Sequence, residues 1–261
     1  MTPTSIPTTP SGHGLLDGKT VLVTAAAGTG IGFATAIRCA QEGARVALSD
    51  IHERRLGEAA QRIAEITAQP PLTVLCDVTV ESQVQQMIAA VVAGYGRLDV
   101  LINNAGLGGQ ASILEMTDEQ WGRVLDVTLN GTFRCMRAAL RHMTDRQGGV
   151  IVNNASVVGW RAQAGQSHYA AAKAGVMALT RCAAMDVARD GVRINAVAPS
   201  IAMHEHLVKA SSPELLEDLE AREAYGRAAD PAEVATVIAF LASDYSSYMT
   251  GEIVSVSAQH P

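Results

Sequence analysis

The chain has 261 residues, and a typical domain size of about 150 residues makes this one large domain or two small ones. Hydrophobic residues make up 48% of it and charged residues 18%, so the chain can bury a sizeable core and is not globally disordered. Its net charge of −6 has the wrong sign for electrostatic binding to nucleic acid or to an anionic membrane, and no apolar run approaches the roughly 18 residues of a membrane-spanning helix.

Residues 1–14 contain three of the nine prolines and one large aliphatic residue, Ile6. This composition cannot form a core and predicts a disordered N-terminal tail. The segment also lacks the basic residues and the apolar stretch of a targeting peptide.

From Lys19 onward, short apolar runs alternate with helical patterns. Strands that are apolar throughout and alternate with helices indicate a parallel sheet covered on both faces, that is, one doubly wound α/β domain over about 15–261. Strands are expected at 21–23, 45–50, 73–77, 98–103, 150–153, 192–197 and 253–257, and helices at 32–42, 53–68, 81–95, 118–146, 169–189 and 231–242.

The four cysteines share no CxxC spacing and no metal-ligand spacing. We therefore expect small buried thiols in a reducing, cytoplasmic compartment, and no metal site. The four are Cys39, Cys76, Cys135 and Cys182.

A glycine-rich turn, from Thr24 to Gly32, follows the first predicted strand. In a doubly wound sheet, ligands bind beyond the carboxyl ends of the strands beside this position. Glycines let the backbone approach a pyrophosphate, and the next helix offers unpaired N–H groups. Glycines are also common in tight strand–helix turns that bind nothing.

Asp50 ends the second predicted strand, 18 residues after Gly32. A carboxylate there can accept hydrogen bonds from both adenosine ribose hydroxyls and would repel a 2′-phosphate. Ile51 follows it, so no adjacent arginine compensates the charge. Unless Asp50 only opens a solvated turn, the sequence favours NAD over NADP. Further polar residues, Asp77 and Asn104, follow the third and fourth strands where an adenine or ribose edge can lie, although such residues are also ordinary turn formers.

Tyr169 and Lys173 are spaced i, i+4 at the start of a predicted helix, so both side chains lie on one face. A nearby ammonium stabilises a phenolate and lowers the pKa of the tyrosine, which makes it a usable general acid or base. Ser156 ends the fifth strand and can hold a substrate oxygen beside the phenol. Such a pair alone is most often a helix surface; its position after the fifth strand gives it weight.

Taken together, these motifs resemble the short-chain dehydrogenase/reductase family over nearly the whole ordered length. The matching stretches are Gly28–Gly32, Asp50, Cys76–Val78, Asn103–Gly106, Ser156, Tyr169–Lys173 and Arg193–Pro199. The resemblance implies a Rossmann-like fold with a seven-stranded parallel sheet, a homotetramer, and hydride transfer between a nicotinamide and a carbonyl or alcohol.

The resemblance also implies roles for individual residues. Tyr169 is the proton donor or acceptor, Lys173 binds the nicotinamide ribose and lowers the tyrosine pKa, and Ser156 polarises the carbonyl. The implied cofactor-binding residues are Thr24, Ala26, Gly28, Gly30, Ile31, Gly32, Asp50, Asp77, Val78, Asn104, Ala105, Gly106, Tyr169, Lys173, Pro199 and Ile201.

The chain departs from the family pattern at four places. Ala26, or Ala25 if the turn is one residue longer, replaces the first glycine, and its methyl can press on the adenosine side of the cofactor. Thr128 replaces the fourth catalytic residue, an asparagine, and can hold a water of the proton relay with less geometric control. Ser200 replaces the glycine after Pro199, and the usual threonine is missing from 201–204. Residues 256–261 replace a V-D-G-G ending.

Within the family, the chain is similar to actinobacterial enzymes of cholesterol C/D-ring breakdown. The stretches 24–32, 152–161, 167–181 and 243–261 carry this similarity, which implies oxidation of a ring hydroxyl on a CoA-linked, partly degraded steroid. A 3-oxoacyl thioester reductase is the alternative enzyme, although it would prefer NADPH. A catalytically inactive NAD-binding regulator is the alternative outside the enzymes. Thr128 and the altered loop at Pro199 favour it, and the intact Ser156, Tyr169 and Lys173 oppose it.

The segment of about 201–227 is expected to cover the substrate as a loose lid, although an ordinary pair of surface helices fits its charge spacing equally well. It carries four basic side chains, His204, His206, Lys209 and Arg222. Trp160 and Arg161 follow Ser156 and can line the pocket, the first against rings and the second against a phosphate or carboxylate; plain packing explains Trp160 equally well.

Overall fold

The computed structural model describes residues 4–67, 70–210 and 213–258. Its centre is a seven-stranded, entirely parallel sheet in the order β3-β2-β1-β4-β5-β6-β7. The strands are β1 Thr20–Thr24, β2 Arg45–Asp50, β3 Leu72–Leu75, β4 Val100–Asn103, β5 Gly149–Asn154, β6 Val192–Pro199 and β7 Ile253–Val256. The predicted Rossmann-like, doubly wound fold is therefore confirmed.

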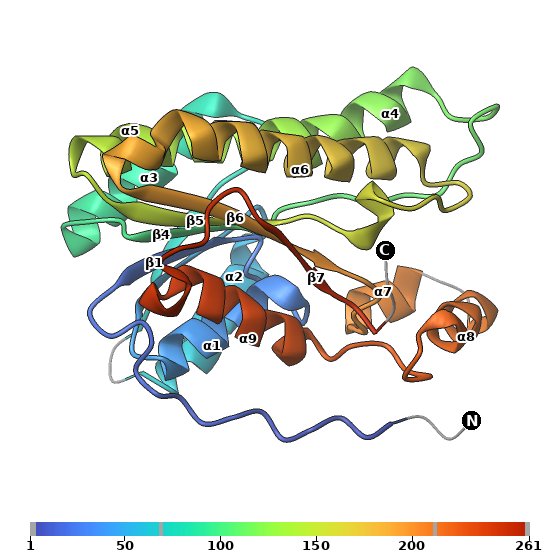
Figure 1. The fold of residues 1–261 in the computed structure, drawn as a ribbon, viewed down its shortest axis with the longest axis horizontal. Coiled ribbons are helices and arrows are strands. Elements are labelled where there is room, and N and C mark those ends of the chain that lie inside the picture. The colour runs from blue at the N-terminus through green and yellow to red at the C-terminus, as the bar shows by residue number, and fades with distance from the viewer. Residues whose placement is uncertain (1–3, 68–69, 211–212, 259–261) are drawn as a thin grey trace.

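Helices cover both faces of the sheet (Figure 1), so the central strands are buried along most of their length and are mainly apolar. One face carries α1 Ile31–Gln41, α2 Glu53–Ala64 and α9 Pro231–Ala242, and the other carries α3 Glu81–Tyr95, α4 Asp118–Leu125, α5 Gly131–Asp145 and α6 Ser167–Val187. The two larger apolar clusters lie one on each side of the sheet, and a third, smaller one lies between α6 and β6. The helix expected at 53–68 ends at Ala64, and residues 68–69 lie outside the described residues.

The long helix expected at 118–146 is interrupted. A π-helical turn, Asp126–Asn130, separates α4 from α5. Arg134 fixes this turn from the next helix, because its guanidinium donates to the main-chain oxygen of Asp126 at 3.4 Å and to its carboxylate at 2.8 Å. π-Turns inside helices are frequent at functional sites, and this one contains Thr128.

Residues 4–14 form no helix or strand and run along the outside of α1 and α9 (Figure 1). The buried ion pair of Arg38 with Glu42 holds them there. Arg38 donates to the main-chain oxygen of Pro10 at 2.6 Å, and Glu42 accepts from the main-chain N–H groups of His13 and Leu15 at 2.8 and 3.1 Å. The mobility of the tail stays a prediction.

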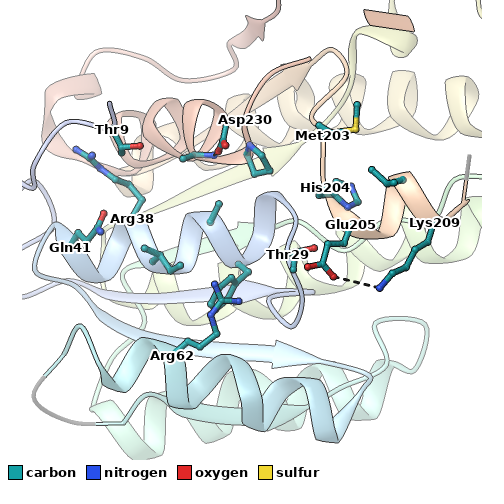
Figure 2. Close-up of a pocket in the computed structure, with 16 residues that line it drawn as sticks. Thr9, Thr29, Arg38, Gln41, Arg62, Met203, His204, Glu205, Lys209 and Asp230 are labelled. Atoms are coloured by element: carbon teal, nitrogen blue, oxygen red, sulfur yellow. Dashed lines mark hydrogen bonds and ion pairs between the residues drawn. The ribbon is translucent and has the colours of Figure 1, made fainter. Parts of the chain in front are cut away.

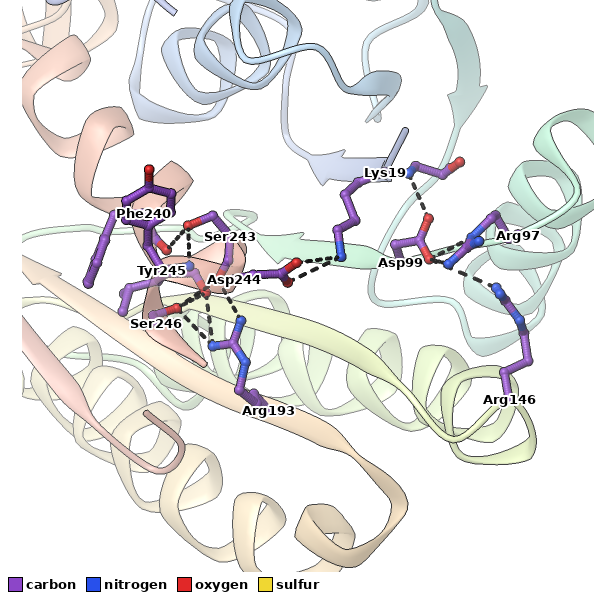
Figure 3. A network of polar contacts seen from close by, with 12 residues as sticks. Lys19, Arg97, Asp99, Arg146, Arg193, Phe240, Ser243, Asp244, Tyr245 and Ser246 are labelled. Atoms are coloured by element: carbon purple, nitrogen blue, oxygen red, sulfur yellow. Dashed lines mark hydrogen bonds and ion pairs between the residues drawn. The ribbon is translucent and has the colours of Figure 1, made fainter. Parts of the chain in front are cut away.

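The amino ends of the strands are fixed by polar contacts (Figure 3). Asp99 accepts from the main-chain N–H of Thr20 at 2.8 Å and from Nε of Arg97 at 2.6 Å. Arg193, at the start of β6, donates to Ser246 Oγ and to the main-chain oxygen of Ser243, both at 2.9 Å. These contacts leave the opposite, carboxyl edge of the sheet to the loops that form the site.

Three of the cysteines are buried, as expected, but Cys182 is exposed. It lies on α6, on a side of the helix that faces away from the core, so the expectation of a buried thiol is wrong at this position. No helix among the described residues is long and apolar enough to cross a membrane.

Candidate active site

The predicted site residues gather beyond the carboxyl ends of β1, β4, β5 and β6. Within the glycine-rich turn, Ala25 has a φ of +49°, so it is the position at which a left-handed backbone would favour glycine. Ala26 is fully buried and packs into the core beneath the turn. A contact between the methyl of Ala26, or of Ala25, and a bound cofactor stays a prediction.

Gly32 shows why the turn needs glycine at that place. A Cβ on Gly32 would lie 2.3 Å from Nδ2 of Asn104 and 2.4 Å from the main-chain oxygen of Ala25. Its absence lets Asn104 reach that oxygen, to which it donates a hydrogen bond at 3.1 Å. Thr24 completes the junction, because its Oγ1 accepts from the main-chain N–H groups of Asn104 and Ala105 at 3.0 and 3.1 Å.

Asp50 is buried against the same turn. Its carboxylate accepts from the main-chain N–H of Ala27 at 3.1 Å and from that of His52 at 3.0 Å. Burial raises the pKa of this carboxyl, and the hydrogen bond from Ala27 and the positive charge of Arg55 oppose the rise. Arg55, from α2, is therefore a basic group close enough to act on Asp50, which the sequence did not suggest.

Asp77 and Val78 follow β3 at the neighbouring part of this edge. Asp77 accepts from the N–H and the hydroxyl of Thr79 at 2.9 and 2.7 Å, so its carboxylate closes a local turn. Val78 is buried, and a Cβ on Gly131 would lie 2.7 Å from its side chain. The contacts of both residues are structural, and their contact with a cofactor stays a prediction.

Ser156, Tyr169 and Lys173 meet where β5 ends and α6 begins. The side chains of Ser156 and Tyr169 are hydrogen-bonded to each other, and Nζ of Lys173 lies 5.5 Å from the centre of the Tyr169 ring. Lys173 is buried, and its ammonium donates to the main-chain oxygen of Asn154 at 2.5 Å. The spacing of Tyr169 and Lys173 therefore does place both side chains at one point beside Ser156.

Burial dominates the protonation of this cluster. It raises the pKa of the Tyr169 phenol above its usual value, and the hydrogen bond from Ser156 offsets only part of the rise. It also lowers the pKa of Lys173 to about 8. The expected lowering of the Tyr169 pKa by Lys173 stays a prediction: the ammonium is directed to Asn154 here, and the Tyr169 side chain is half-buried.

Thr128 lies in the π-turn, fully buried. Its hydroxyl accepts from the main-chain N–H of Leu107 at 3.0 Å and donates to the main-chain oxygen of the same residue at 3.1 Å. Gly106 lies between Thr128 and Lys173: a Cβ on Gly106 would be 3.5 Å from Lys173 Nζ and 3.8 Å from Thr128 Oγ1. Asn130 is exposed and donates to Asp126, so it faces away from the site.

The loop after β6 closes the site beside Ser156. The main-chain oxygen of Pro199 accepts from Ser156 Oγ at 3.5 Å, and Ile201 accepts from the main-chain N–H of Ala229 at 2.9 Å. His204, where the family threonine is missing, lies over the glycine-rich turn: a Cβ on Gly30 would be 3.6 Å from its ring.

The segment 201–227 contains α7 Glu205–Ala210 and α8 Pro213–Arg222. Glu223, which follows α8, attaches this segment to the site, a role that no sequence pattern indicated. This buried carboxylate accepts from Ser200 Oγ at 3.0 Å and lies 3.9 Å from the guanidinium of Arg161. Trp160 is 41% exposed nearby. The side chain of His206 lies outside the described residues.

A cavity of about 640 Å³ lies next to the site, between α1, α7 and the start of α9 (Figure 2). Its lining includes Thr29 of the glycine-rich turn, His204, and Lys209, which forms an ion pair with Glu205 at 3.5 Å. It does not include Ser156, Tyr169 or Lys173. Within residues 4–67, 70–210 and 213–258, no His, Cys, Asp or Glu side chains are grouped as a metal site would need.

The geometry fits a nicotinamide cofactor. Gly32 has no side chain to keep Asn104 from the turn, and a Cβ on Gly106 would lie 3.5 Å from Lys173 Nζ. The Oδ1 of Asn154, beside Asn104 and Lys173, is buried and has no hydrogen-bond partner among the described residues. Glycines, buried polar acceptors and a helix N-terminus at one sheet edge are what such a cofactor requires.

Comparison with known proteins agrees with this geometry. A family model described as enoyl-(acyl carrier protein) reductase matches residues 25–258. The chain is 64% identical over 252 residues, 96% of each chain, to the (5R,7aS)-5-hydroxy-7a-methyl-1-oxo-2,3,5,6,7,7a-hexahydro-1H-indene-carboxyl-CoA reductase of Mycobacterium tuberculosis. It is 39% identical to a 3-oxoacyl-(acyl-carrier-protein) reductase of Thermotoga maritima, over 92% of this chain and 97% of the relative.

A solved structure is equally similar. The crystal structure of a short chain dehydrogenase from Mycobacterium smegmatis superimposes with a TM-score of 0.88 at 58% sequence identity, and the match covers 98% of this chain and 99% of that one.

Proposed function

Because the chain belongs to the short-chain dehydrogenase/reductase family, whose oxidoreductases use nicotinamide cofactors, we propose that it uses NAD to interconvert a secondary alcohol and a ketone on an alicyclic, CoA-linked intermediate of steroid degradation. The observation that carries the proposal is the meeting of Ser156, Tyr169 and Lys173 beside the glycine-rich turn. The ring substrate is supported by the 64% identical relative, whose name gives a bicyclic CoA-linked substrate.

In this proposal the cofactor accepts or delivers the hydride, and the residues of the chain handle the proton. Ser156 donates a hydrogen bond to the substrate oxygen and holds that oxygen beside the phenol of Tyr169. In the reducing direction Tyr169 gives its proton to that oxygen; in the oxidising direction it takes the proton back. Lys173 and the Asn104–Gly106 turn would hold the nicotinamide end, and the 24–32 turn would hold the pyrophosphate.

NAD rather than NADP is supported by Asp50, whose buried carboxylate would repel a 2′-phosphate. Arg55 weakens this argument, since its charge acts on Asp50. A reductase of 3-oxoacyl thioesters is the second candidate, supported by the 39% identical relative. We also propose a cytoplasmic homotetramer whose segment 201–227 covers the substrate.

The test is an assay of the purified chain, read at the nicotinamide absorbance, with oxidised NAD or NADP for the alcohols and with NADH or NADPH for the 3-oxoacyl substrate. Alicyclic secondary alcohols linked to CoA are compared with linear 3-oxoacyl-CoA. We expect NAD-dependent oxidation of the ring alcohols and weak turnover of the linear substrate. Faster turnover of the linear thioester with NADPH would overturn the proposal in favour of the second candidate.

A further inference from the structure

Two asparagine pairs join β4 to β5 side by side, on opposite faces of the sheet. Asn103 Nδ2 donates to Asn153 Oδ1, and Asn154 Nδ2 donates to Asn104 Oδ1, both at 2.9 Å. Successive side chains of a strand alternate between faces. Asn153 accordingly lies toward α5 and α6, where it donates to Thr180 at 2.9 Å, and Asn154 lies on the side of the glycine-rich turn.

The second pair belongs to a continuous chain of hydrogen bonds. Asn154 holds Asn104, and Asn104 in turn donates to the main-chain oxygen of Ala25 at 3.1 Å. The main-chain oxygen of Asn154 accepts from Lys173 at 2.5 Å. One residue of β5 therefore contacts both the buried lysine and the asparagine that supports the turn.

The Ala25 end of this chain is the part that needs support. An alanine with a φ of +49° is in a conformation that L-residues rarely adopt, and such residues persist only where their surroundings fix them. The bond from Asn104 is one of those constraints. It acts on the turn whose main-chain N–H groups lie at the N-terminus of α1.

The polar contacts of Asn154 do not suit a purely structural role. A leucine at position 154 would fill a similar volume and bury no polar atom. The asparagine instead buries its Oδ1, which has no partner among the described residues. An unpaired buried acceptor destabilises a fold. The N–H bond to Asn104 is thus the contribution that the carboxamide makes.

We propose that Asn154 is a positioning residue for the cofactor: its carboxamide fixes Asn104 and so the glycine-rich turn, while its main-chain oxygen fixes Lys173 in register with that turn. The inference rests on the proposed function. Since the substitution of the side chain leaves the main-chain oxygen in place, its effect is expected on cofactor affinity more than on kcat.

The test is isothermal titration of NAD into the full-length protein and its Asn154→Leu variant, with the thermal midpoint of each. We expect Kd and KM for NAD to rise about tenfold, and kcat at saturating NAD to fall by a smaller factor. The matched control is Asn153→Leu, which removes the same bond on the other face: we expect a lower midpoint and a Kd within twofold of the parent. Asn104→Ala combined with Asn154→Leu should bind NAD no more weakly than Asn104→Ala alone, because both changes break one chain.

The inference is overturned if Asn154→Leu binds NAD as the parent does, or if Asn153→Leu weakens binding equally. If Asn154→Leu does not fold, Asn154→Asp takes its place, since this isosteric side chain has no N–H for Asn104 and the same rise in Kd is expected. A parent protein that binds neither NAD nor NADP would overturn the proposed function together with this inference, whereas a parent that binds NAD separates the two.

Discussion

The hydroxyl of Thr128 pairs both main-chain groups of Leu107, at 3.0 Å to its nitrogen and 3.1 Å to its oxygen. A single side-chain atom thereby ties the π-turn of the 118–145 region to the loop that carries Asn104–Gly106. Thr128 is therefore an anchor of that loop, and its hydroxyl has already used its one proton. If this hydroxyl holds a water, as expected, it can do so only by accepting a hydrogen bond from that water.

Thr128→Val should lower both stability and turnover. The change keeps the shape but leaves the N–H and the oxygen of Leu107 unpaired, at a cost of about 1–3 kcal/mol. Thr128→Ser, which restores the hydroxyl, should recover most of both. Chemical denaturation and steady-state kinetics measure the two effects. If Asn130→Ala, a change at an exposed site, slows turnover more than Thr128→Val, the assignment of this position is wrong.

Tyr169→Phe should reduce kcat by about 100-fold or more, because general acid–base catalysis contributes at least that factor. NAD affinity should change little, since only the transferable proton is lost. Tyr95→Phe is the matched control: the Tyr95 hydroxyl accepts from Leu72 N–H and donates to the oxygen of Val46, away from the site, so its loss should lower Tm and spare kcat. Substantial turnover by the Tyr169→Phe enzyme would exclude Tyr169 as the acid or base.

The rate in the oxidising direction should rise with pH from neutral upward. Burial raises the pKa of Tyr169, so the phenolate that accepts the substrate proton is scarce at neutral pH. In the reducing direction the protonated phenol is the reactive form, and the rate should be flat there. Initial rates at saturating substrates, measured in both directions, test this; an oxidation rate that is independent of pH would contradict it.

Lys173→Met should stabilise the fold while reducing activity. Burial lowers the pKa of Lys173 from 10.5 to about 8. Below pH 8 the folded chain therefore buries an ammonium that water would solvate in the unfolded chain. Between those two values the unfolded chain binds more protons, and the free energy of unfolding rises with pH. Removing the charge should raise the free energy of unfolding at neutral pH by about 1–2 kcal/mol, once the loss of the hydrogen bond to Asn154 is subtracted. The denaturation midpoint of the variant should also lose this pH dependence; a variant less stable than the parent at neutral pH refutes the idea.

Asp50→Asn should narrow the preference for NAD over NADP by about tenfold, because it removes one like charge beside the 2′-position and keeps the shape. Adding Arg55→Ala tests whether the neighbouring guanidinium helps to hold the 2′-phosphate. If it does, the double variant should bind NADP more weakly than Asp50→Asn alone. The ratio of Kd values for the two cofactors is the measurement. Tighter binding of NADP by the unchanged protein would reverse the cofactor assignment.

Ala25→Gly should raise stability by about 1 kcal/mol, since glycine adopts the left-handed backbone without strain. For a chain of this size that corresponds to roughly 2–4 °C in Tm. Ala26→Gly is the control: the fully buried methyl of Ala26 would be lost, and Tm should fall. Equal effects of the two changes would show that the backbone of Ala25 is not strained.

The parts that could be predicted from the sequence are those set by local pattern. Apolar runs gave strand positions within a few residues, and the four-residue spacing of Tyr169 and Lys173 placed both side chains at one point. The break at Asp126–Asn130 could not be predicted, because the contacts of Arg134 that hold it come from the next helix.

The remaining features of the site depend on partners distant in sequence. Asn104 and Asn154 are 50 residues apart, and Ser200 and Glu223 are 23 apart. None of these pairs has a spacing that a pattern would detect. The effect of burial on the pKa of Tyr169 is hidden in the sequence for a related reason, since burial depends on the complete fold.

The N-terminal segment has a practical consequence. Its Thr4 N–H donates to the main-chain oxygen of Tyr225 at 3.1 Å, and Tyr225 lies at the far end of the segment proposed to cover the substrate. Residues 4–14 thus run as a strap from the Arg38–Glu42 pair to that cover (Figure 1). We therefore expect an N-terminal fusion tag to disturb this strap, and kinetic constants measured with and without such a tag would show the effect.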